Sequence, residues 1–388
     1  MKKVCIAGIA LLFLFAVFCG VGAAEETRTF VDDLGREVEL PVVVDSVSPS
    51  GTLAQIVLYS FGPENFATLC QGFSDAQKHF IYPEIYNLPE TGSMFGAKMT
   101  MNAEEIMSLD KEIGIDVVID LGAAKASIGP GMDDMQEKTG IPFVFITQDT
   151  LKDIRQSYLT LGEMLGQEER GQELADYLGG IVDMTYENME KVGDEKATFI
   201  YITNIDGNSV NILGKGSYFA EVLDLVGENI APDAVTGSGK GDLYSMEEVM
   251  QMNPDYVLVS ASAYAEHRFY DTIMESEMWH VLPAVKEGRV YEVPYECPDS
   301  WTSPASNRLV TALWLGNLYY PEVFDYDVKE KIVEFYDVFY HYDMTEEELG
   351  EIMKYSFDES KSSVATPVPV TGLLAGLAAA GLFVLRRK

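Results

Sequence analysis

The sequence is poor in cysteine, histidine and basic residues, which form metal centres, disulfide frameworks and basic interaction surfaces. Its 388 residues include four cysteines and four histidines, and 27 lysines and arginines stand against 62 aspartates and glutamates. Cys5 and Cys19 fall in the apolar N-terminal segment, which leaves only Cys70 and Cys297, far apart in the chain. This spacing argues against a zinc motif or a disulfide framework. The formal net charge of −35 argues against nucleic acid as a partner, because an acidic surface repels phosphate.

The motifs of the common enzyme classes are missing as well. The sequence contains no G-x-S-x-G, no H-E-x-x-H, no phosphate loop and no G-x-G-x-x-G after a strand. The segment GSGKGD at 237–242 lacks the Walker spacing. We therefore expect no enzyme, no catalytic residue and no cofactor of the protein's own. A protein that binds free metal ions is an alternative, but it needs three or four converging ligands, and the histidines are scattered.

Both ends of the chain carry apolar segments. Lys2 and Lys3 precede an apolar run to Phe18, and small residues follow, so residues 1–24 are predicted to be a secretory signal peptide. Lipidation of Cys19 is disfavoured because Phe18 stands where a small residue is expected. Residues 356–369 are predicted to be a spacer. The apolar stretch in 370–388 ends in three basic residues, which suits a membrane anchor with its basic cluster on the cytoplasmic side. The body would then lie on the extracellular face of the membrane.

The sequence 368–372, Val-Pro-Val-Thr-Gly, resembles an archaeal C-terminal sorting signal of the Val-Pro-x-Ser-Gly type, with Thr in place of Ser. The resemblance implies processing at the cell surface. A plain anchor helix explains the segment equally well, and both interpretations place the protein at the membrane.

The body alternates short apolar runs with amphipathic stretches, which predicts an α/β protein with mostly parallel sheets covered on both faces. The segment TFVDDLGREVELP at 29–41 predicts a β-hairpin. The predicted strands are 42–47, 66–70, 116–120, 142–146, 198–203, 209–213, 256–260 and 289–294, with helices such as 53–59, 103–109 and 219–226 between them.

A weak internal sequence repeat, called the echo below, predicts two lobes of similar build. MNAEEIMSL at 101–109 precedes the strand at 116–120, and YSMEEVMQM at 244–252 precedes the strand at 256–260. Between these units, a helical pattern broken near Gly166 predicts one long helix from 168 to about 191. We therefore divide the body into an N-terminal lobe at 25–165, a bridging helix at 166–194, and a C-terminal lobe with closing helices at 195–355.

These pieces, in this order, resemble the substrate-binding proteins of ABC importers for iron-siderophore, haem and cobalamin-type metal chelates. The resemblance rests on the hairpin, on VDSVSPSGTLAQIVLYSFG, on the two echoed units, on WHVLPAVKEGRVYEVP and on the C-terminal helices. It implies two Rossmann-like lobes bridged by a single long helix, with the ligand cleft between them. It also implies an ABC permease and its ATPase as partners, and a ligand that itself carries iron or cobalt. A surface protein that binds or adheres without transport remains an alternative.

The resemblance implies permease docking by Glu104 and Glu247, which recur at equivalent places in the echo. Carboxylates at helix starts also interact favourably with the helix dipole, which would explain them without a partner.

In α/β folds of this kind, ligands bind at the carboxyl ends of the strands, here the loops after 47, 70, 120, 203, 213, 260 and 294. Aromatic side chains in such loops suit a large chelate. The predicted ligand residues are Trp301, Tyr295, Met94, Phe95, Tyr218, Tyr264 and Tyr82. Arg268 and Arg308 are the arginines that we place near the cleft. So few cations favour a neutral or weakly charged chelate, such as a corrinoid or a carbonyl-rich iron complex.

Overall fold

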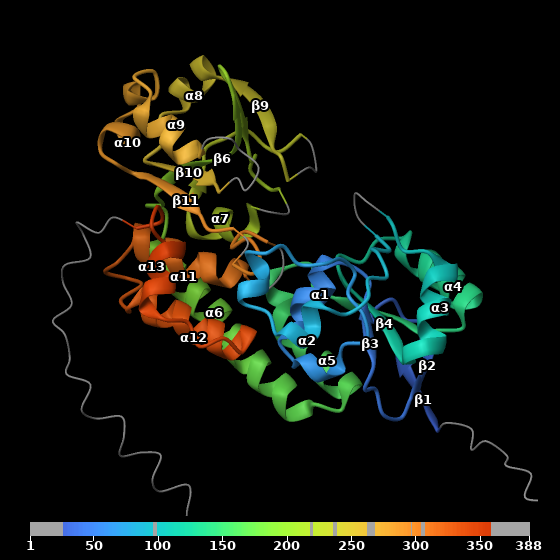
Figure 1. The fold of residues 1–388 in the computed structure, drawn as a ribbon. Coiled ribbons are helices and arrows are strands. Elements are labelled where there is room, and N and C mark those ends of the chain that lie inside the picture. Colours follow the sequence, from blue (N-terminus) through green and yellow to red (C-terminus); the bar gives the residue numbers. More distant parts are fainter. Residues whose placement is uncertain are drawn as a thin grey trace, which may run out of the picture.

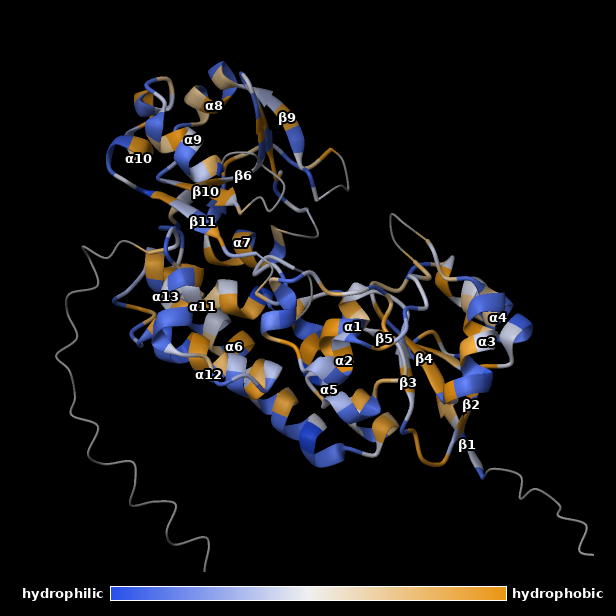
Figure 2. Cartoon of the chain, viewed as in Figure 1, coloured by the Kyte–Doolittle hydropathy of each residue, from blue (hydrophilic) through white to orange (hydrophobic). Residues whose placement is uncertain are grey.

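The computed structural model describes residues 26–95, 99–217, 220–235, 239–261, 268–295, 297–303 and 307–357. Two lobes, each built on its own sheet, lie on either side of a helical layer, as Figure 1 shows. In Figure 2 the central strands of both sheets are mainly hydrophobic, and the outer helices alternate hydrophobic and hydrophilic residues. This is the pattern expected of sheets that are covered on both faces.

The N-terminal lobe is built on a parallel sheet in the order β3-β4-β5. Strand β4 is buried along its whole length. The strands are β3 (Val47–Pro49), β4 (Val117–Gly122) and β5 (Phe143–Thr147), and the helices are α1 (Thr52–Tyr59), α2 (Pro83–Tyr86), α3 (Ala103–Ile113), α4 (Ile128–Thr139) and α5 (Ile154–Leu165).

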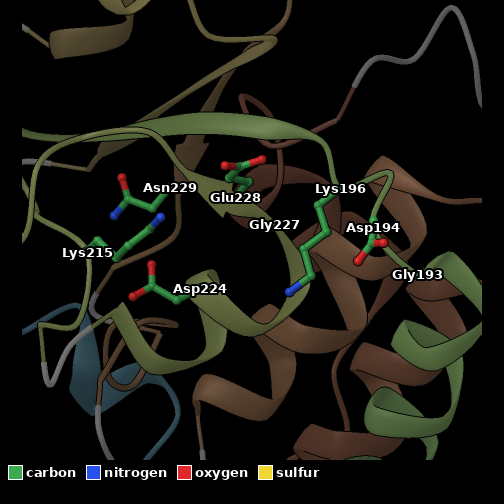
Figure 3. Close-up of a pocket in the computed structure, with 8 residues that line it drawn as sticks. All are labelled: Gly193, Asp194, Lys196, Lys215, Asp224, Gly227, Glu228 and Asn229. Atoms are coloured by element: carbon green, nitrogen blue, oxygen red, sulfur yellow. The ribbon is translucent and has the colours of Figure 1, made fainter.

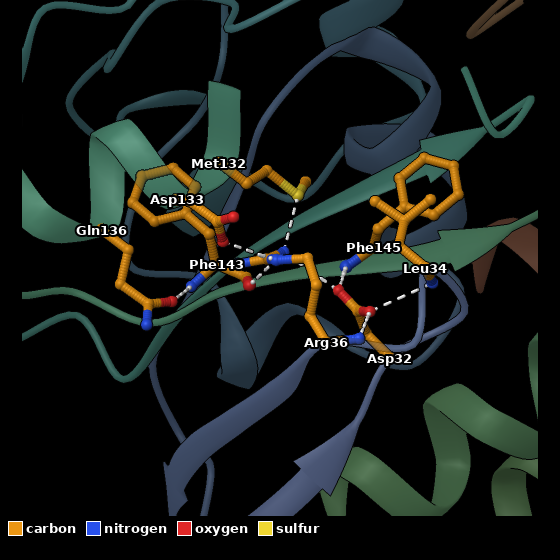
Figure 4. A network of polar contacts seen from close by, with 8 residues as sticks. All are labelled: Asp32, Leu34, Arg36, Met132, Asp133, Gln136, Phe143 and Phe145. Carbon is orange, nitrogen blue, oxygen red and sulfur yellow. Dashed lines mark hydrogen bonds and ion pairs between the residues drawn. The ribbon is translucent and has the colours of Figure 1, made fainter. Parts of the chain in front are cut away.

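The predicted hairpin is present as β1 (Thr27–Val31) and β2 (Glu37–Pro41), and its tip covers the edge of the sheet at β5. The Asp32 carboxylate, which is buried, accepts hydrogen bonds from the backbone N–H groups of Arg36 at 2.9 Å and Phe145 at 3.3 Å (Figure 4). The Arg36 guanidinium pairs with Asp32 at 3.0 Å and donates to the carbonyl oxygen of Phe143 at 3.1 Å. The Asp-Asp-Leu-Gly-Arg sequence therefore supplies both the turn and the partners for an exposed strand edge.

The predicted long helix is α6 (Glu168–Val192). Helix α5 ends at Gly166, whose φ of 65° is a left-handed conformation that glycine adopts without strain. The two helices then pack closely, because a Cβ on Gly162 would lie 2.9 Å from the Cα of Gly171. None of the helices in the described ranges, α6 included, has the length and apolar character needed to cross a membrane.

The C-terminal lobe contains a mixed sheet in the order β11-β10-β6-β7-β9, with β8 paired to β6. Strands β11, β10 and β6 are parallel, and β7 and β9 extend the sheet in antiparallel fashion. The strands are β6 (Thr198–Asp206), β7 (Ser209–Ile212), β8 (Glu228–Asn229), β9 (Asp242–Ser245), β10 (Tyr256–Ser260) and β11 (Val290–Val293). The helices of this lobe are α7 (Glu221–Val226), α8 (Met246–Met252), α9 (Phe269–Glu275) and α10 (Pro283–Lys286).

The closing helices α11 (Arg308–Tyr319), α12 (Val328–Tyr340) and α13 (Glu346–Ile352) connect the two lobes. Arg170 of α6 donates to the carbonyl oxygen of Ser60 at 2.8 Å and to that of Val338. The Tyr82 hydroxyl donates to the carbonyl oxygen of His341 at 3.1 Å. On the other side, the backbone N–H of Glu292 in β11 donates to Tyr355 at 2.9 Å. The C-terminal segment is thus fixed to both lobes.

Most of the predicted strands agree with the structure, and two do not. The prediction at 42–47 is wrong for most of its length, because the strand begins at Val47 and Val42 and Val43 are exposed. The prediction at 66–70 is also wrong: this segment makes isolated bridges only, from Phe66 to Val47 and from Leu69 to Glu90. Strand β9 was not predicted, because DLYS has no strong apolar alternation.

Candidate ligand-binding cleft

A pocket of about 310 Å³ lies in the C-terminal lobe where β10 and β11 end and where the parallel pairing of β6 with β10 ends, at Ile202. This is the edge at which open α/β sheets bind ligands. Its lining residues are Tyr201, Thr203, Leu213, Gly239, Lys240, Ser260, Tyr295, Asp299, Ser300, Thr302 and Ser303.

The pocket wall consists largely of hydroxyl groups. Burial raises the pKa of Tyr201, so this phenol stays protonated, and its oxygen lies 3.5 Å from that of Thr302. Burial also raises the pKa of Asp299, although hydrogen bonds from Ser303 and the backbone of Ser300 oppose the shift. Among the lining residues that the structure describes, Lys240 is the one basic side chain. The wall can therefore hold a ligand by many neutral hydrogen bonds and few charges.

On the N-terminal lobe, the corresponding strand ends bring Ser50 and Asp120 together. Ser50 follows β3, and its hydroxyl donates to the buried Asp120 carboxylate in β4. Burial raises the pKa of Asp120 to about 6, against the lowering effect of the Ser50 hydrogen bond. The backbone N–H of Met94 donates to the carbonyl oxygen of Ser50 at 2.8 Å, which holds the 94–95 loop beside this edge.

Of the predicted ligand residues, Tyr295 lines the pocket and is 41% exposed. Trp301 lies in the core instead: its side chain is fully buried, packs against Trp314 with ring centroids 5.8 Å apart, and donates from Nε1 to the Tyr336 hydroxyl at 3.3 Å. A direct ligand contact by Trp301 remains a prediction, and in this conformation protein atoms cover the ring.

Three further predicted ligand residues that the structure describes do not line this pocket. Met94 is buried, and Phe95 packs with it against Gly131 of α4. Tyr82 contacts Tyr59, with ring centroids 6.2 Å apart, and the backbone of His341. Tyr218 and Tyr264 lie outside the described residues, so their place in the ligand site stays a prediction. Among the predicted ligand residues in the described ranges, Tyr295 is the one that lines the pocket.

Both arginines placed near the cleft have protein partners. Arg308 is 2% exposed, and its Nη1 lies 2.5 Å from the Glu221 carboxylate. Arg268 pairs with the buried Glu292 and lies over the ring of Tyr355, 4.3 Å from its centroid. Because both side chains contact other parts of the protein, we interpret them as structural.

A smaller pocket of about 220 Å³ lies at the opposite end of β6, where that strand begins (Figure 3). Lys196 and Lys215 point into it beside Asp224. Lys196 donates to the carbonyl oxygen of Leu225 at 3.0 Å, and Asp224 accepts from the backbone of Gly216 at 2.7 Å. These polar groups thus connect α7 to neighbouring segments of the same chain. The pocket lies away from the strand ends that form the cleft.

The two proposed docking residues are exposed in the first turns of their helices. Asn102 caps α3, and its side chain accepts from the backbone N–H of Glu104 at 2.8 Å. Ser245 caps α8 in a capping box with Glu248, whose carboxylate accepts from Ser245 at 2.7 Å. The Glu248 carboxylate therefore caps its own helix, whereas the Glu247 side chain makes no hydrogen bond or ion pair with any of the described residues.

Metal-ligand clusters of three or more His, Cys, Asp or Glu side chains are not found within the described ranges. Cys70 and Cys297 are buried thiols, and burial raises the pKa of each to about 12. Because the thiolate is the form that binds metals, these side chains are poor ligands near neutral pH.

The hydroxyl residues of the pocket were missed in the sequence, although their loops were predicted. Thr203 and Ser260 stand at the ends of predicted strands, and Ser300, Thr302 and Ser303 follow the last one. Their position after predicted strands was the feature that could have identified these residues. Residue type could not, because serine and threonine are common in every kind of loop.

The described residues thus form two sheet-containing lobes, joined by a long helix, with a pocket at the ends of strands. The family model described as "Periplasmic binding protein" matches residues 116–296. The chain is 25% identical over 311 residues to the "Iron-uptake system-binding protein" of Bacillus subtilis, covering 75% of this chain and 90% of that protein. The chain is therefore similar in sequence to periplasmic binding proteins.

Solved structures show the same fold. An ABC transporter solute binding protein from Sulfurospirillum deleyianum matches with a TM-score of 0.74 and 21% identity, over 84% of this chain and 99% of that one. The periplasmic catecholate-siderophore binding protein of Vibrio cholerae matches with a TM-score of 0.53 and 18% identity, over 74% and 98%. The chain thus has the two-lobed α/β fold of these binding proteins, as predicted.

Proposed function

We propose that this protein is the extracellular solute-binding component of an ABC importer. It captures a metal chelate of the iron-siderophore, haem or corrinoid type and delivers it to a membrane permease and its ATPase. The observation that carries the proposal is the pocket at the ends of β10 and β11, lined by hydroxyls and by Tyr295. The family match and the iron-uptake relative support the same function.

A binding role without chemistry fits the groups in the pocket. The Tyr201 phenol and the Asp299 carboxyl both have raised pKa values because they are buried. In this proposal both groups hydrogen-bond to the ligand. The ligand is then released unchanged.

Delivery would use Glu104 and Glu247, one on each lobe, as contacts with basic residues of a two-fold permease. Segments 1–24 and 370–388 would export the body and hold it at the outer face of the membrane. Both parts of the proposal extend the sequence analysis and are tested separately below.

A binding screen tests the proposal. The purified protein is titrated with haem, cobalamin, cobinamide and several ferric siderophores, and binding is followed by calorimetry. We expect at least one chelate to bind more tightly than about 100 µM, equivalent to about −5.5 kcal/mol. Failure of every chelate would reject the proposed function.

A further inference from the structure

The smaller pocket, at the beginning of β6, is polar throughout its described lining. Its residues come from the loop between α6 and β6, from the segment after β7, and from α7 and β8. Charged side chains, one amide and two glycines line it, and none of these described residues has an apolar side chain. Its volume of about 220 Å³ is smaller than the roughly 300–1,000 Å³ typical of pockets for drug-sized ligands, so it suits a small polar molecule.

Two lysines enter this pocket from opposite sides (Figure 3), and neither forms an ion pair with a carboxylate of the described residues. Lys196 is half-buried and donates to the carbonyl oxygen of Leu225 at 3.0 Å, which leaves further N–H donors of its ammonium group for a ligand. The Lys215 ammonium makes no hydrogen bond with any residue in the described ranges. The pocket therefore contains positive charge that its own carboxylates do not pair.

Asp224, which lies beside both lysines in Figure 3, has one carboxylate oxygen without a hydrogen bond. Its Oδ2 accepts from the backbone N–H of Gly216 at 2.7 Å, whereas its Oδ1 is buried and has no hydrogen-bond partner among the described residues. Burial raises the pKa of Asp224, and the nearby Asn229 amide, whose Nδ2 donates to the carbonyl oxygen of Leu213 at 3.0 Å, opposes the shift together with the lysines. Because a buried acceptor without a partner costs free energy, Oδ1 favours a ligand that donates a hydrogen bond.

The charges around the pocket select against simple ions. The two lysines stand against Asp194, Asp224 and Glu228, so a free anion would meet three carboxylates. A metal ion would meet two ammonium groups, and the described part of the chain contains no group of three or more metal-ligating side chains. A zwitterion satisfies both signs, because its carboxylate accepts from the lysines and its ammonium group donates to Asp224. Charge-assisted hydrogen bonds of this kind are about twice as strong as neutral ones.

We propose that this pocket is a second binding site, which takes a small α-amino acid such as glycine or serine. The ligand carboxylate lies between Lys196 and Lys215, and the ligand ammonium group donates to Oδ1 of Asp224. Since Lys196 follows α6 and Asp224 belongs to α7, the bound amino acid connects the end of the bridging helix to the C-terminal lobe. The site lies at the opposite end of β6 from the cleft, so the inference does not depend on the proposed function.

Saturation-transfer NMR on the full-length protein tests the site with serine, glycine and two single-charge analogues, acetate and methylammonium. We expect serine and glycine to bind with a Kd of about 1 mM or lower. Each analogue should bind at least about tenfold more weakly, because it makes only part of the charge-assisted hydrogen bonds. Lys215→Met and Asp224→Asn should each weaken serine binding about tenfold or more, as expected for loss of a hydrogen bond to a charged group. Lys286→Met, an exposed lysine of the same lobe outside the pocket, is the matched control and should bind as the wild type does.

Three results would overturn the inference. No binding of either amino acid at millimolar concentration would reject the site, and binding of acetate as tightly as serine would show a site for anions instead. Unchanged serine binding in both Lys215→Met and Asp224→Asn, or an equal loss in Lys286→Met, would show that this pocket does not hold the ligand. Circular dichroism of each variant confirms that the fold is retained. Each of these results leaves chelate binding at the cleft standing, because the two pockets share no lining residue.

Discussion

The imidazole of His79 lies 2.9 Å from the carboxylate of Glu348, although 269 residues separate them in the sequence. His79 belongs to the N-terminal lobe and Glu348 to α13. The Tyr342 hydroxyl donates to the same carboxylate at 2.6 Å. The last helix of the described residues is therefore fastened to the first lobe.

This contact predicts a pH-dependent contribution to stability. Hydrogen bonds from Tyr342 and then Thr345 lower the pKa of Glu348 to about 2. Because the unfolded pKa is about 4.3, the stabilisation is complete above about pH 5 and is lost as the pH falls towards 2. Glu348→Gln should lower the free energy of unfolding by about 1 kcal/mol at pH 7.

Urea titrations of the wild type and Glu348→Gln between pH 7 and pH 2 measure this effect. The two proteins should converge in stability towards pH 2. Glu347→Gln, an exposed neighbour in the same helical turn, serves as the control and should change little. A constant difference at every pH would show that the carboxylate charge is not involved.

The buried pair of Arg308 and Glu221 should be structural and not part of the ligand site. Two nitrogen atoms of the Arg308 guanidinium have no hydrogen-bond partner among the described residues. Removing the Glu221 charge would leave a buried cation uncompensated, so Glu221→Gln should destabilise the fold by about 3 kcal/mol. Thermal unfolding measures the loss, and ligand affinity measured below the melting temperature should be unchanged. A large loss of affinity in a folded variant would place Arg308 in the binding site.

Charge reversal tests permease docking. Glu104→Lys with Glu247→Lys should fold and bind ligand normally but lose uptake of the labelled chelate in cells, because like charges would meet the basic residues expected on the permease. Glu248 is unsuitable as a control, since it caps α8. The control pair is Glu105→Lys with Glu275→Lys, two exposed carboxylates without such a role. Equal damage from both pairs would point to overall charge, and full uptake by the first pair would reject the docking assignment.

Truncation tests the proposed attachment to the membrane. A chain that ends after Ser363 should be found in the medium, with ligand binding intact, because retention is assigned to 370–388. Cell fractionation followed by immunoblotting measures the distribution. If the truncated protein stays with the membrane, lipid on Cys19 or a tight permease complex would explain retention instead.

The sequence allowed the fold to be predicted further than the site. Helix α6, the hairpin and the two echoed helix–strand units follow from local patterns: caps at Asn102 and Ser245, and a glycine stop at Gly166. Local patterns could not place Trp301. It stands among polar residues in the sequence, yet tertiary packing against Trp314 and Tyr336 buries it. Aromatic character alone does not distinguish a residue that lines the cleft from one that is buried below it.

The face on which Asn204 lies was hidden for a different reason. Asn204 lies on the same face of the sheet as Thr203 only because the register shifts after Ile202, and a one-residue shift reverses the face of a side chain. Simple alternation along 198–203 cannot reveal such a shift. Strand β9 was missed because it is short and lies at the edge of the sheet.

The most direct test of the central claim compares two tyrosines that the sequence put forward equally. Tyr295 lines the pocket, whereas Tyr82 packs against Tyr59 and His341. Calorimetric titration of the chelate that binds most tightly should show affinity reduced about tenfold or more in Tyr295→Ala, since an aromatic contact at the centre of an interface is typically worth more than 1 kcal/mol. Tyr82→Ala should bind as the wild type does. Unchanged affinity in Tyr295→Ala, or a greater loss in Tyr82→Ala, would contradict a binding site at the ends of β10 and β11.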